Sequence, residues 1–448
     1  MKLRSYQVEI VKKGVNFMTS SKKVKPSIIV APTAAGKSII IASIAKETKE
    51  KIITLQPNKE LLQQNYDKFT LLGGEASIYS ASFGKKEIGH VTYATIGSIY
   101  KTPEIFLEAG IKKIIIDECH LYPRESSGML NTFISALKAT HVLGLTATPL
   151  KLQNNMDSYG SSYSKLVMLT NRSKKGTFFK DIIHVTQISE LVDNGYWTKL
   201  TYQAYDFKTG DLVYNSSKSD YTEKSMEIAY KNNNIGMKII SKIDELRDRK
   251  HILVAVPSIA EAEDLAKKIS NAACVSSLTP KKERDEIISN FRNGSIRAVI
   301  QVNVLSVGFD YPELDCLVCG RPTASISWWY QFVGRGTRTH DEKKDCLIVD
   351  FSGNFSTFGK VEDLHYDKEY DSWELYGKDL IKISGVPIHE IGLYHKKKEG
   401  EYVLDFGKFR GTPLKETPQD YRDWMLKTFD FAGDKGKVLK KELELLKK

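Results

Sequence analysis

The chain has 448 residues, of which 41% are hydrophobic and 27% are charged, a composition typical of a soluble globular protein with a sizeable core. No apolar run approaches the ~20 residues of a membrane span, no signal peptide is apparent, and five cysteines are too few for a disulfide framework, so we expect a cytoplasmic protein of about three domains. The net charge of +11 suits a polyanion such as nucleic acid, although a solvated basic surface would also explain it.

Residues 4–18 are predicted to form an amphipathic helix, with Tyr6 and Ile10 near helical spacing. Arg4 and Gln7 lie at its start, and a glutamine amide can both donate to and accept from the edge of a base. These two residues could recognise adenine, or the segment could be a plain surface helix.

Residues 27–38 read S-I-I-V-A-P-T-A-A-G-K-S, which predicts a buried strand, a stop at Pro32, a turn of small residues and the start of a helix. Backbone N–H groups at such a helix start bind phosphate. Lys37 would contact the β- and γ-phosphates of a nucleotide, and the hydroxyl of Ser38 would hold Mg²⁺. Ala31 stands where the strict pattern G-x-x-x-x-G-K-[ST] has glycine, so a chance strand–turn–helix with a lysine cap is the alternative.

Short apolar strands then alternate with helices, which predicts a parallel sheet whose ligands lie beyond the carboxyl ends of its strands. One strand, K-I-I-I at residues 113–116, ends in two adjacent carboxylates. Asp117 would orient Mg²⁺ and Glu118 would polarise the attacking water, unless the pair is only an acidic turn. His120 either couples polar groups at this site or caps the loop, and a T-A-T-P stretch at 146–149 could link the phosphate site to its surroundings.

The motifs A-P-T-A-A-G-K-S, P-N-K-E-L-L-Q-Q, D-E-C-H and T-A-T-P, in this order, resemble those of superfamily 2 helicases of the DEAD/DExH type. In the second half, N-V-L-S-V-G-F-D at 303–310 and Q-F-V-G-R-G-T-R at 331–338 resemble motifs V and VI of this superfamily. The resemblance covers about residues 3–353. It implies an α/β protein with two tandem RecA-like parallel-sheet domains that bind ATP and Mg²⁺ in the cleft between them.

We place the first domain at residues 1–185, a junction at 186–235, the second domain at 236–355 and a small α+β C-terminal extension at 356–448. In the second domain, Cys316 and Cys319 form a C-x-x-C. No second pair lies nearby, so an apolar strand explains these cysteines better than a zinc site.

Site roles follow from the resemblance, position by position. The ATP-binding residues would be Arg4, Gln7, Thr33, Ala34, Ala35, Gly36, Lys37, Ser38, Gly308 and Asp310. The catalytic residues would be Lys37, Asp117, Glu118, Gln331, Arg335 and Arg338, with Ser38 and Asp117 holding Mg²⁺. Arg335 and Arg338 would stabilise charge on the γ-phosphate from the second domain, so hydrolysis would depend on closure of the cleft. Many members have glycine in place of Ala34, and alanine resists the positive φ that glycine tolerates.

Nucleic-acid contacts in this superfamily come from loops on one face of both domains. The matching residues here are Pro57, Asn58, Thr92, Thr95, Ser98, Pro257, Ser258, Asn303 and Ser306. Short hydroxyl, amide and backbone N–H groups suit contacts with phosphate and do not read sequence.

Near the C-terminus, residues 406–424 follow the pattern F-G-K-x-x-G-x-P-L-x-x-x-P-x-x-Y-x-x-W, which resembles a small module appended to DNA-processing proteins. Lys408 and Arg410, interleaved with aromatic residues, could engage DNA ends or unstacked bases. The aromatic residues could instead form a mini-core, whose members would be Phe406, Leu414, Tyr421, Trp424 and Leu426.

These features together predict an ATP-driven DNA motor. The D-E-C-H, T-Y-A-T-I-G-S and Q-F-V-G-R-G-T-R stretches look most like phage branch-migration helicases of the bacteriophage T5 and T4 type, which implies branch migration, fork reversal, recombination or repair. We expect a monomer on branched or forked DNA, with no membrane partner. A duplex DNA translocase, an RNA helicase and an ATP-gated nucleic-acid clamp are the alternatives.

Overall fold

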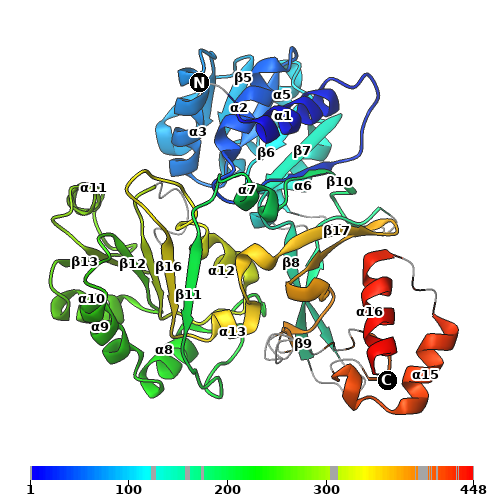
Figure 1. Cartoon of the computed structure of the whole chain (residues 1–448). Coiled ribbons are helices and arrows are strands. Elements are labelled where there is room, and N and C mark those ends of the chain that lie inside the picture. Colours follow the sequence, from blue (N-terminus) through cyan, green and yellow to red (C-terminus); the bar gives the residue numbers. More distant parts are fainter. Residues whose placement is uncertain are drawn as a thin grey trace.

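Two α/β domains and a small C-terminal module make up the chain. The computed structural model describes residues 3–446 except 123–127, 157–161, 173–175, 303–310, 389, 392–401, 403, 405, 410–411, 430 and 432. Figure 1 shows the first domain at the top, the second at the lower left and the C-terminal helices at the lower right. The predicted α/β class, with one mainly parallel sheet in each domain, is confirmed.

The first domain is built on an eight-stranded sheet with the order β10-β1-β7-β6-β2-β5-β3-β4, in which only β3 and β4 pair antiparallel. Its strands are β1 (Ser27–Val30), β2 (Ile52–Leu55), β3 (Ser77–Ser80), β4 (Lys85–Lys86), β5 (Val91–Ala94), β6 (Lys113–Ile116), β7 (His141–Thr146) and β10 (Asp181–Val185). Its helices are α1 (Ser5–Met18), α2 (Lys37–Glu47), α3 (Lys59–Leu71), α4 (Ile96–Ile99), α5 (Pro103–Glu108) and α6 (Met129–Ala136), with short 3₁₀ turns η1 (Ala81–Phe83) and η2 (Cys119–Leu121).

The second domain has a six-stranded, all-parallel sheet with the order β11-β16-β15-β12-β14-β13. Its strands are β11 (Leu200–Ala204), β12 (Ile252–Ala255), β13 (Ala272–Val275), β14 (Ala298–Gln301), β15 (Cys316–Cys319) and β16 (Cys346–Asp350). Its helices are α8 (Glu223–Asn232), α9 (Ile235–Glu245), α10 (Ile259–Lys268), α11 (Lys281–Arg292), α12 (Ile326–Val333) and α13 (Asn354–Phe358).

The central strands of both sheets are buried along their whole length, as in β1, β2, β6, β12 and β15. Helices cover both faces of a parallel sheet, so such strands read as apolar runs without polar alternation. Polar side chains therefore collect where the strands end. Loops that follow β1, β6 and β7 carry the phosphate-loop, D-E-C-H and T-A-T-P stretches.

The connection between the domains is shorter than the predicted junction at 186–235. β11 lies inside that stretch and pairs in parallel with β16, from Leu200 beside Cys346 to Ala204 beside Asp350. Residues from 200 onward thus supply an edge strand of the second sheet, which the sequence pattern did not reveal. The connection is limited to residues 186–199, called the linker below, and it contains α7 (Ile188–Asp193).

Two antiparallel hairpins lie outside the sheets. β8 (Leu150–Met156) and β9 (Ser162–Met168) follow the T-A-T-P stretch, and β17 (His365–Glu369) and β18 (Ser372–Tyr376) follow the second domain. The β17–β18 segment returns to the first domain. The Tyr366 hydroxyl donates to the Ala147 carbonyl (3.3 Å), and the backbone N–H of Gly385 donates to Leu166 (2.6 Å). Two short 3₁₀ turns, η3 (Val361–Asp363) and η4 (Lys378–Leu380), flank this hairpin in the chain.

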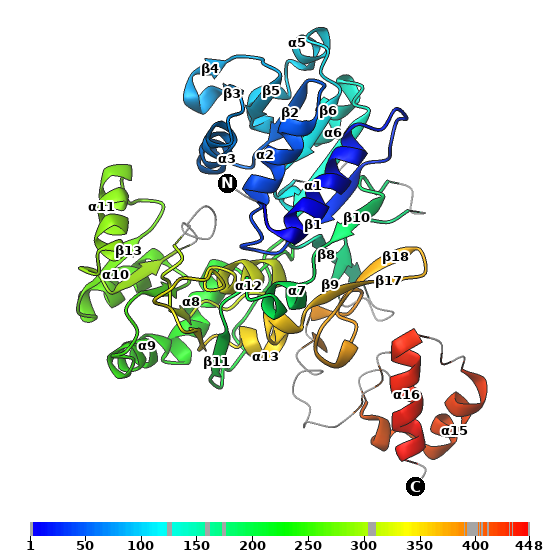
Figure 2. The ribbon, with the colours of Figure 1, turned by 45° about the horizontal axis from the view of Figure 1, so that its top comes forward.

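The C-terminal module has its own small core. Its buried members are Leu404, Leu414, Met425, Leu439 and Leu443. α15 (Gln419–Thr428) packs against α16 (Gly433–Leu445) after the turn η5 (Leu414–Glu416), and Figures 1 and 2 both show the two helices side by side and away from the second domain.

The predicted mini-core of this module is partly wrong. Leu414 is buried as expected, but Trp424 is 47% exposed, with ring contacts to Tyr421 and Phe429. On α15 the adjacent Met425 points inward, and successive helical positions are turned by about 100°, so Trp424 is carried to the surface.

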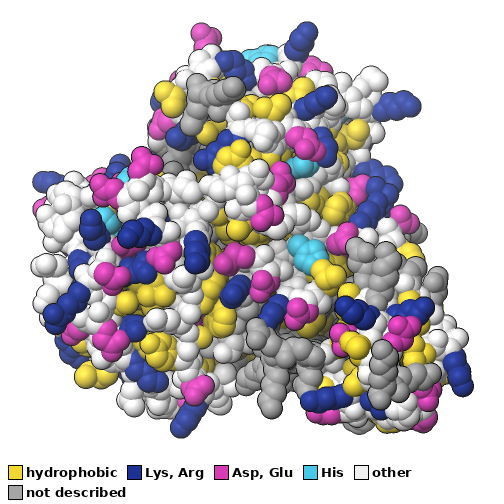
Figure 3. Space-filling view, in the orientation of Figure 1, with side chains coloured by type: hydrophobic (Ala, Val, Ile, Leu, Met, Phe, Trp, Pro, Cys, Tyr) yellow, Lys and Arg dark blue, Asp and Glu magenta, His cyan; other side chains and the backbone are white. Residues whose placement is uncertain are grey.

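The surface of the molecule has no single basic face in the orientation of Figure 3. Lys and Arg side chains are scattered there among Asp and Glu. The net charge of +11 therefore does not by itself locate a nucleic-acid path on this face. Within the described part of the chain, no helix combines the length and apolarity that crossing a membrane requires.

The stability of the first domain is expected to depend on the protonation of His184 in β10. Its Nδ1 accepts from the ammonium of Lys13 (3.1 Å), so its Nε2–H donates to the hydroxyl of Thr186 (3.0 Å). Burial, with Lys13 in second place, lowers the pKa of His184 to about 4. The unfolded state binds more protons between that pKa and about 6.5, so the free energy of unfolding falls as the pH is lowered through this window.

We predict that His184→Gln reduces the difference in unfolding free energy between pH 7 and pH 5, measured by denaturant titration. His340→Gln, at a partly exposed position in the second domain, is the matched control. An unchanged pH dependence in His184→Gln would contradict the prediction.

Candidate nucleotide-binding cleft

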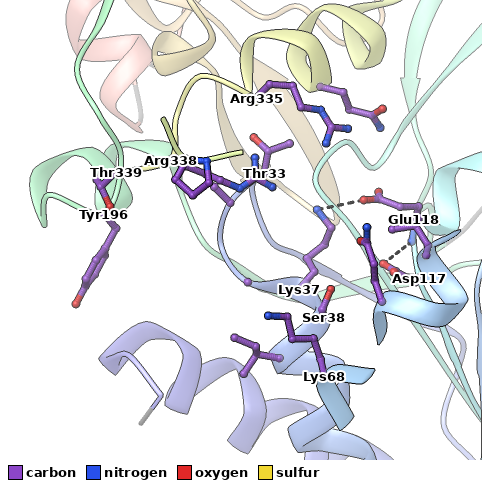
Figure 4. Close-up of a pocket in the computed structure, with 18 of the residues that line it drawn as sticks. Thr33, Lys37, Ser38, Lys68, Asp117, Glu118, Tyr196, Arg335, Arg338 and Thr339 are labelled. Atoms are coloured by element: carbon purple, nitrogen blue, oxygen red, sulfur yellow. Dashed lines mark hydrogen bonds and ion pairs between the residues drawn. The ribbon is translucent and has the colours of Figure 1, made fainter. Parts of the chain in front are cut away.

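A cavity of about 480 Å³ lies between the two domains and brings together most of the predicted ATP-site residues. The first domain and the linker line it with Arg4, Thr33, Ala34, Gly36, Lys37, Ser38, Ile39, Leu61, Gln64, Lys68, Asp117, Glu118, Leu121 and Tyr196. The second domain lines it with Pro312, Gln331, Gly334, Arg335, Arg338 and Thr339. In Figure 4, Arg335 and Arg338 face Lys37 across the cavity, and Tyr196 lies at the opposite end from Glu118.

The loop before α2 is held in a strained but supported shape. Ala34 has a φ of 58° and Gly36 a φ of 79°, both in the left-handed region. A side chain at Gly36 would also collide with Gln7, whose Nε2 would be 2.6 Å from an added Cβ. The carbonyl of Ala35 accepts from the Tyr6 hydroxyl (3.0 Å) and from Gln7 Nε2 (2.9 Å), so α1 fixes the loop from behind.

Gln7 therefore has a different contact from the predicted one. Its amide oxygen accepts from the backbone N–H of Arg4 (2.9 Å), and its nitrogen donates to Ala35, so both ends of the amide are used inside the protein. The residue is 6% exposed and does not line the cavity. Arg4 does line it, with its guanidinium 4.5 Å from the ring centre of Tyr196.

An ion pair crosses the base of the site. Lys37 Nζ lies 3.2 Å from Glu118 Oε1, which joins the start of α2 to the end of β6 (Figure 4). Burial opposes ionisation of Glu118, but Lys37 and then His120 outweigh this effect and lower its pKa. Glu118 is thus an anion held by Lys37. Its φ of 43° shows that the backbone turns sharply there.

The pKa of Asp117 is shifted in the opposite direction to that of Glu118. Burial, and then the neighbouring Glu118, raise the pKa of Asp117 to about 7. Asn65 on α3 orients the carboxylate by donating to its Oδ2 (2.8 Å). Hydroxyl and carboxylate oxygens are the ligands that Mg²⁺ takes, and a nearby cation favours the ionised form of such a carboxylate. Ser38 and Asp117, which both line the cavity, therefore fit Mg²⁺.

His120 connects the two domains. Its Nδ1 lies 2.8 Å from the Thr146 hydroxyl and 3.4 Å from Glu118 Oε2, and its Nε2 lies 3.2 Å from the amide nitrogen of Gln331 on α12. An amide nitrogen only donates, so in this arrangement Nε2 accepts and Nδ1–H donates to Thr146. These contacts favour the polar-coupler interpretation of His120 over the loop cap, and they give Thr146 the linking contact expected of the T-A-T-P stretch.

Several predicted residues lie elsewhere or outside the described residues. Thr92 and Pro257 are wrong as surface contacts for DNA: Thr92 is 0% exposed with its hydroxyl bonded to Gly89, and Pro257 is buried beyond β12. Asn58 and Ser258 cap α3 and α10, while the Thr95 and Ser98 hydroxyls bond to each other (2.9 Å). Pro57 is half-buried, and Lys408 is exposed. The predicted site residues that lie outside the described part of the chain are Asn303, Ser306, Gly308, Asp310 and Arg410.

Sequence reasoning missed three contributors to the site. Asn65 lies on α3 directly after the P-N-K-E-L-L-Q-Q stretch but was not assigned a role, and Tyr196 and Trp197 lie in a linker without periodicity. Trp197 Nε1 donates to the carbonyl of Thr33 in the phosphate loop (3.2 Å). Only the adjacent aromatic pair could have pointed to these linker residues.

The fold and this cleft define a nucleotide-hydrolysing protein with two RecA-like domains. Comparison with known proteins identifies the family within this class. Residues 1–151 match the family model described as "Type III restriction enzyme, res subunit", and residues 235–340 match the "Helicase conserved C-terminal domain". We therefore assign the chain to the ATP-hydrolysing helicases of superfamily 2, as its motifs predicted.

Three relatives illustrate the similarity. A 51.5 kDa protein of a Lactococcus phage is 25% identical over 372 residues, which are 80% of this chain and 74% of the phage protein. The DNA 3'-5' translocase XPB2 of Sulfurisphaera tokodaii is 25% identical, with 78% and 81% covered. The DNA helicase Hel308 of Pyrococcus horikoshii is 24% identical over 74% of this chain, which spans about half (49%) of Hel308.

A solved structure supports the fold. The ATP-dependent Type ISP restriction-modification enzyme LlaBIII bound to DNA superposes with a TM-score of 0.55 at 15% identity, covering 79% of this chain and 28% of the enzyme. At this identity the likeness concerns the fold alone.

The left-handed backbone at Ala34 leads to a stability prediction. A non-glycine residue in this region costs about 1–2 kcal/mol, whereas adding glycine costs about 0.4–1 kcal/mol through the entropy of the unfolded chain. We expect Ala34→Gly to leave the unfolding free energy unchanged or to raise it by up to about 1 kcal/mol. The control Ala35→Gly, at a buried position without a positive φ, should lower it. Equal destabilisation by both variants in denaturant titrations would contradict this account.

Lys37→Ala should abolish ATP hydrolysis and leave nucleic-acid binding at low salt intact, because the ammonium serves the phosphates and not the nucleic-acid face. ATP turnover and filter binding of an oligonucleotide measure the two properties. Lys12→Ala, at an exposed position of α1, controls for the loss of one positive charge. Loss of nucleic-acid binding in Lys37→Ala alone would mean that the loop has a structural role.

Proposed function

We propose that the protein is an ATP-driven DNA motor. The observation that carries this proposal is the shared cavity, to which one domain supplies Lys37 and Glu118 and the other supplies Arg335 and Arg338. A site split between two domains couples hydrolysis to their relative motion. DNA as the track is supported by two relatives whose names are those of a DNA helicase and a DNA translocase.

The residues suggest how hydrolysis proceeds. When the phosphates of ATP bind, Lys37 exchanges Glu118 for the β- and γ-phosphates. Glu118 is then free to orient a water molecule and accept its proton as the water attacks the γ-phosphorus and ADP leaves. Bound by Ser38 and Asp117, Mg²⁺ would neutralise phosphate charge. Arg335 and Arg338 stabilise the charge that spreads over the phosphoryl oxygens, a contribution worth about 10³–10⁵ in rate.

We further propose that the DNA is branched and that the motor drives branch migration or fork reversal in replication, recombination or repair. The motif resemblance to the branch-migration helicases of bacteriophages T5 and T4 supports this substrate, and the similarity to a Lactococcus phage protein supports a phage setting. The proposed setting is the cytoplasm of a bacterial or phage-infected cell, with a monomer acting on DNA. In the C-terminal module, exposed Lys408 and half-exposed Trp424 are the proposed contacts for phosphate and an unstacked base.

The proposed path of DNA across the two domains uses Pro57, Asn58, Thr95, Ser98 and Ser258 at the ends of parallel strands. Their backbone and hydroxyl groups suit phosphate contacts without sequence readout. Asn303 and Ser306 remain proposed contacts on the same grounds of resemblance, and Gly308 and Asp310 remain proposed nucleotide contacts.

The test is ATP turnover with one oligonucleotide sequence presented as single strand, linear duplex, fork and four-way junction, and as RNA. We expect the strongest stimulation by fork and junction, and a lower junction-to-single-strand ratio in Trp424→Ala. Equal stimulation by all DNA forms would indicate a generic translocase, and stimulation by RNA alone would indicate an RNA helicase. Strand displacement, followed in parallel, separates a motor from a clamp that only binds and releases.

A further inference from the structure

The linker contacts the ATP site at three consecutive residues. Tyr196 lines the cavity beside Arg4. The next residue, Trp197, donates from Nε1 to the carbonyl of Thr33 in the phosphate loop (3.2 Å). Thr198 donates from its hydroxyl to the carbonyl of Arg338 (3.0 Å). One short segment therefore touches both the phosphate loop of the first domain and the arginine segment of the second.

The seam that the linker spans is tightly packed. An added Cβ at Gly334 would lie 2.2 Å from the hydroxyl of Thr33, so the two segments already touch backbone to side chain. Trp197 is 4% exposed and Thr198 is 8% exposed, so the donor side chain of each hydrogen bond is largely shielded from water. Shielded hydrogen bonds of this kind fix geometry more firmly than exposed ones, because breaking them leaves a buried group unpaired.

The backbone around Arg338 is held from two sides. Thr198 contributes two bonds, from its N–H to the carbonyl of Thr337 (2.8 Å) and from its hydroxyl to that of Arg338. From the other side, the ammonium of half-buried Lys343 donates to the same Arg338 carbonyl (2.9 Å) and to that of Gly336 (2.7 Å). Lys343 belongs to the second domain, whereas Thr198 ties this turn to the linker.

The upstream end of the linker is anchored as well. Gln187, the residue before α7, donates from Nε2 to the carbonyl of Tyr366 (2.5 Å) and accepts from its backbone N–H (3.1 Å). Tyr366 in turn donates its hydroxyl to Ala147 in the T-A-T-P stretch (3.3 Å). The linker is thus fixed at its start to the first domain and at its end to the arginine segment.

We propose that Thr198 is a positioning residue for Arg338, and that Trp197 is a positioning residue for the phosphate loop. The linker then sets how far the arginine reaches across the cleft. This inference rests on the role proposed for Arg338 at the γ-phosphate. A displacement of about 1 Å at a reacting group can lower the rate by about 10²-fold. Loss of the hydrogen bond from Thr198 to the Arg338 carbonyl should therefore lower the turnover of ATP.

The experiment compares Thr198→Val with Thr198→Ser in the full-length protein. Valine has the shape of threonine without the hydroxyl, and serine restores the hydroxyl. We expect Thr198→Val to lower kcat about three- to tenfold, the range for one hydrogen bond, and to leave KM for ATP and the Kd for ADP within about twofold. Binding of ADP with aluminium fluoride, which imitates the transition state, should weaken by the same factor as kcat.

Thr198→Ser should keep the turnover of the natural protein, and Thr209→Val, an exposed threonine of the second domain, is the matched control. Turnover is measured with and without the most stimulating oligonucleotide. Unchanged kcat in Thr198→Val, or equal loss in Thr198→Val and Thr198→Ser, would overturn the proposal. If Thr198→Val melts at a lower temperature than the natural protein, Trp197→Phe provides the deciding measurement. The proposal requires that Trp197→Phe raises the KM for ATP, and an unchanged KM in this variant would reject it.

Arg338→Ala separates this inference from the proposed role of the arginine. A loss of ~10³ or more in stimulated turnover is expected. If Arg338→Ala has no effect, the arginine assignment fails and the linker proposal fails with it. If Arg338→Ala is inactive while Thr198→Val matches the natural protein, only the linker proposal fails.

Discussion

The ion pair between Lys37 and Glu118 is the interaction on which the rest of the site depends. It joins the loop after β1 to the end of β6, two strands that are separated in the sheet by β7. Lys37 pairs with Glu118 and lowers its pKa, while burial and the neighbouring Glu118 raise the pKa of Asp117 to about 7. Phosphate and a divalent cation are the groups that would relieve both constraints together.

The second constraint is the seam between the domains. Gly334 packs on Thr33, His120 faces Gln331, and Thr198 holds Arg338. Each contact is short, polar or tightly packed, so a change in the angle between the domains alters several of them together. A site assembled in this way responds to domain closure as a unit, which suits a protein that converts hydrolysis into motion.

Much of the fold and of the candidate site could be predicted from local patterns. The phosphate loop, the D-E-C-H strand and the arginine segment are contiguous stretches whose chemistry shows in a few adjacent residues, and the structure brings Lys37, Glu118 and Arg335 to one cavity. Predictions were wrong for residues whose role depends on the solvent exposure of the side chain or on its contacts in the folded protein. Thr92 is buried, and Trp424 turns outward because Met425 takes the inward position.

The sequence by itself determined the α/β class, the order of the motifs and the strand–turn–helix that carries Lys37, because apolar strand runs and helix starts are local features. Only the tertiary structure decided that β11 belongs to the second sheet, that Asn65 orients Asp117, that Tyr196 lines the cavity, and that Trp197 and Thr198 bond to the segments on either side of it. These contacts join residues far apart in the chain, such as Trp197 with Thr33. Their formation depends on how two sheets and a linker pack, which no local pattern encodes.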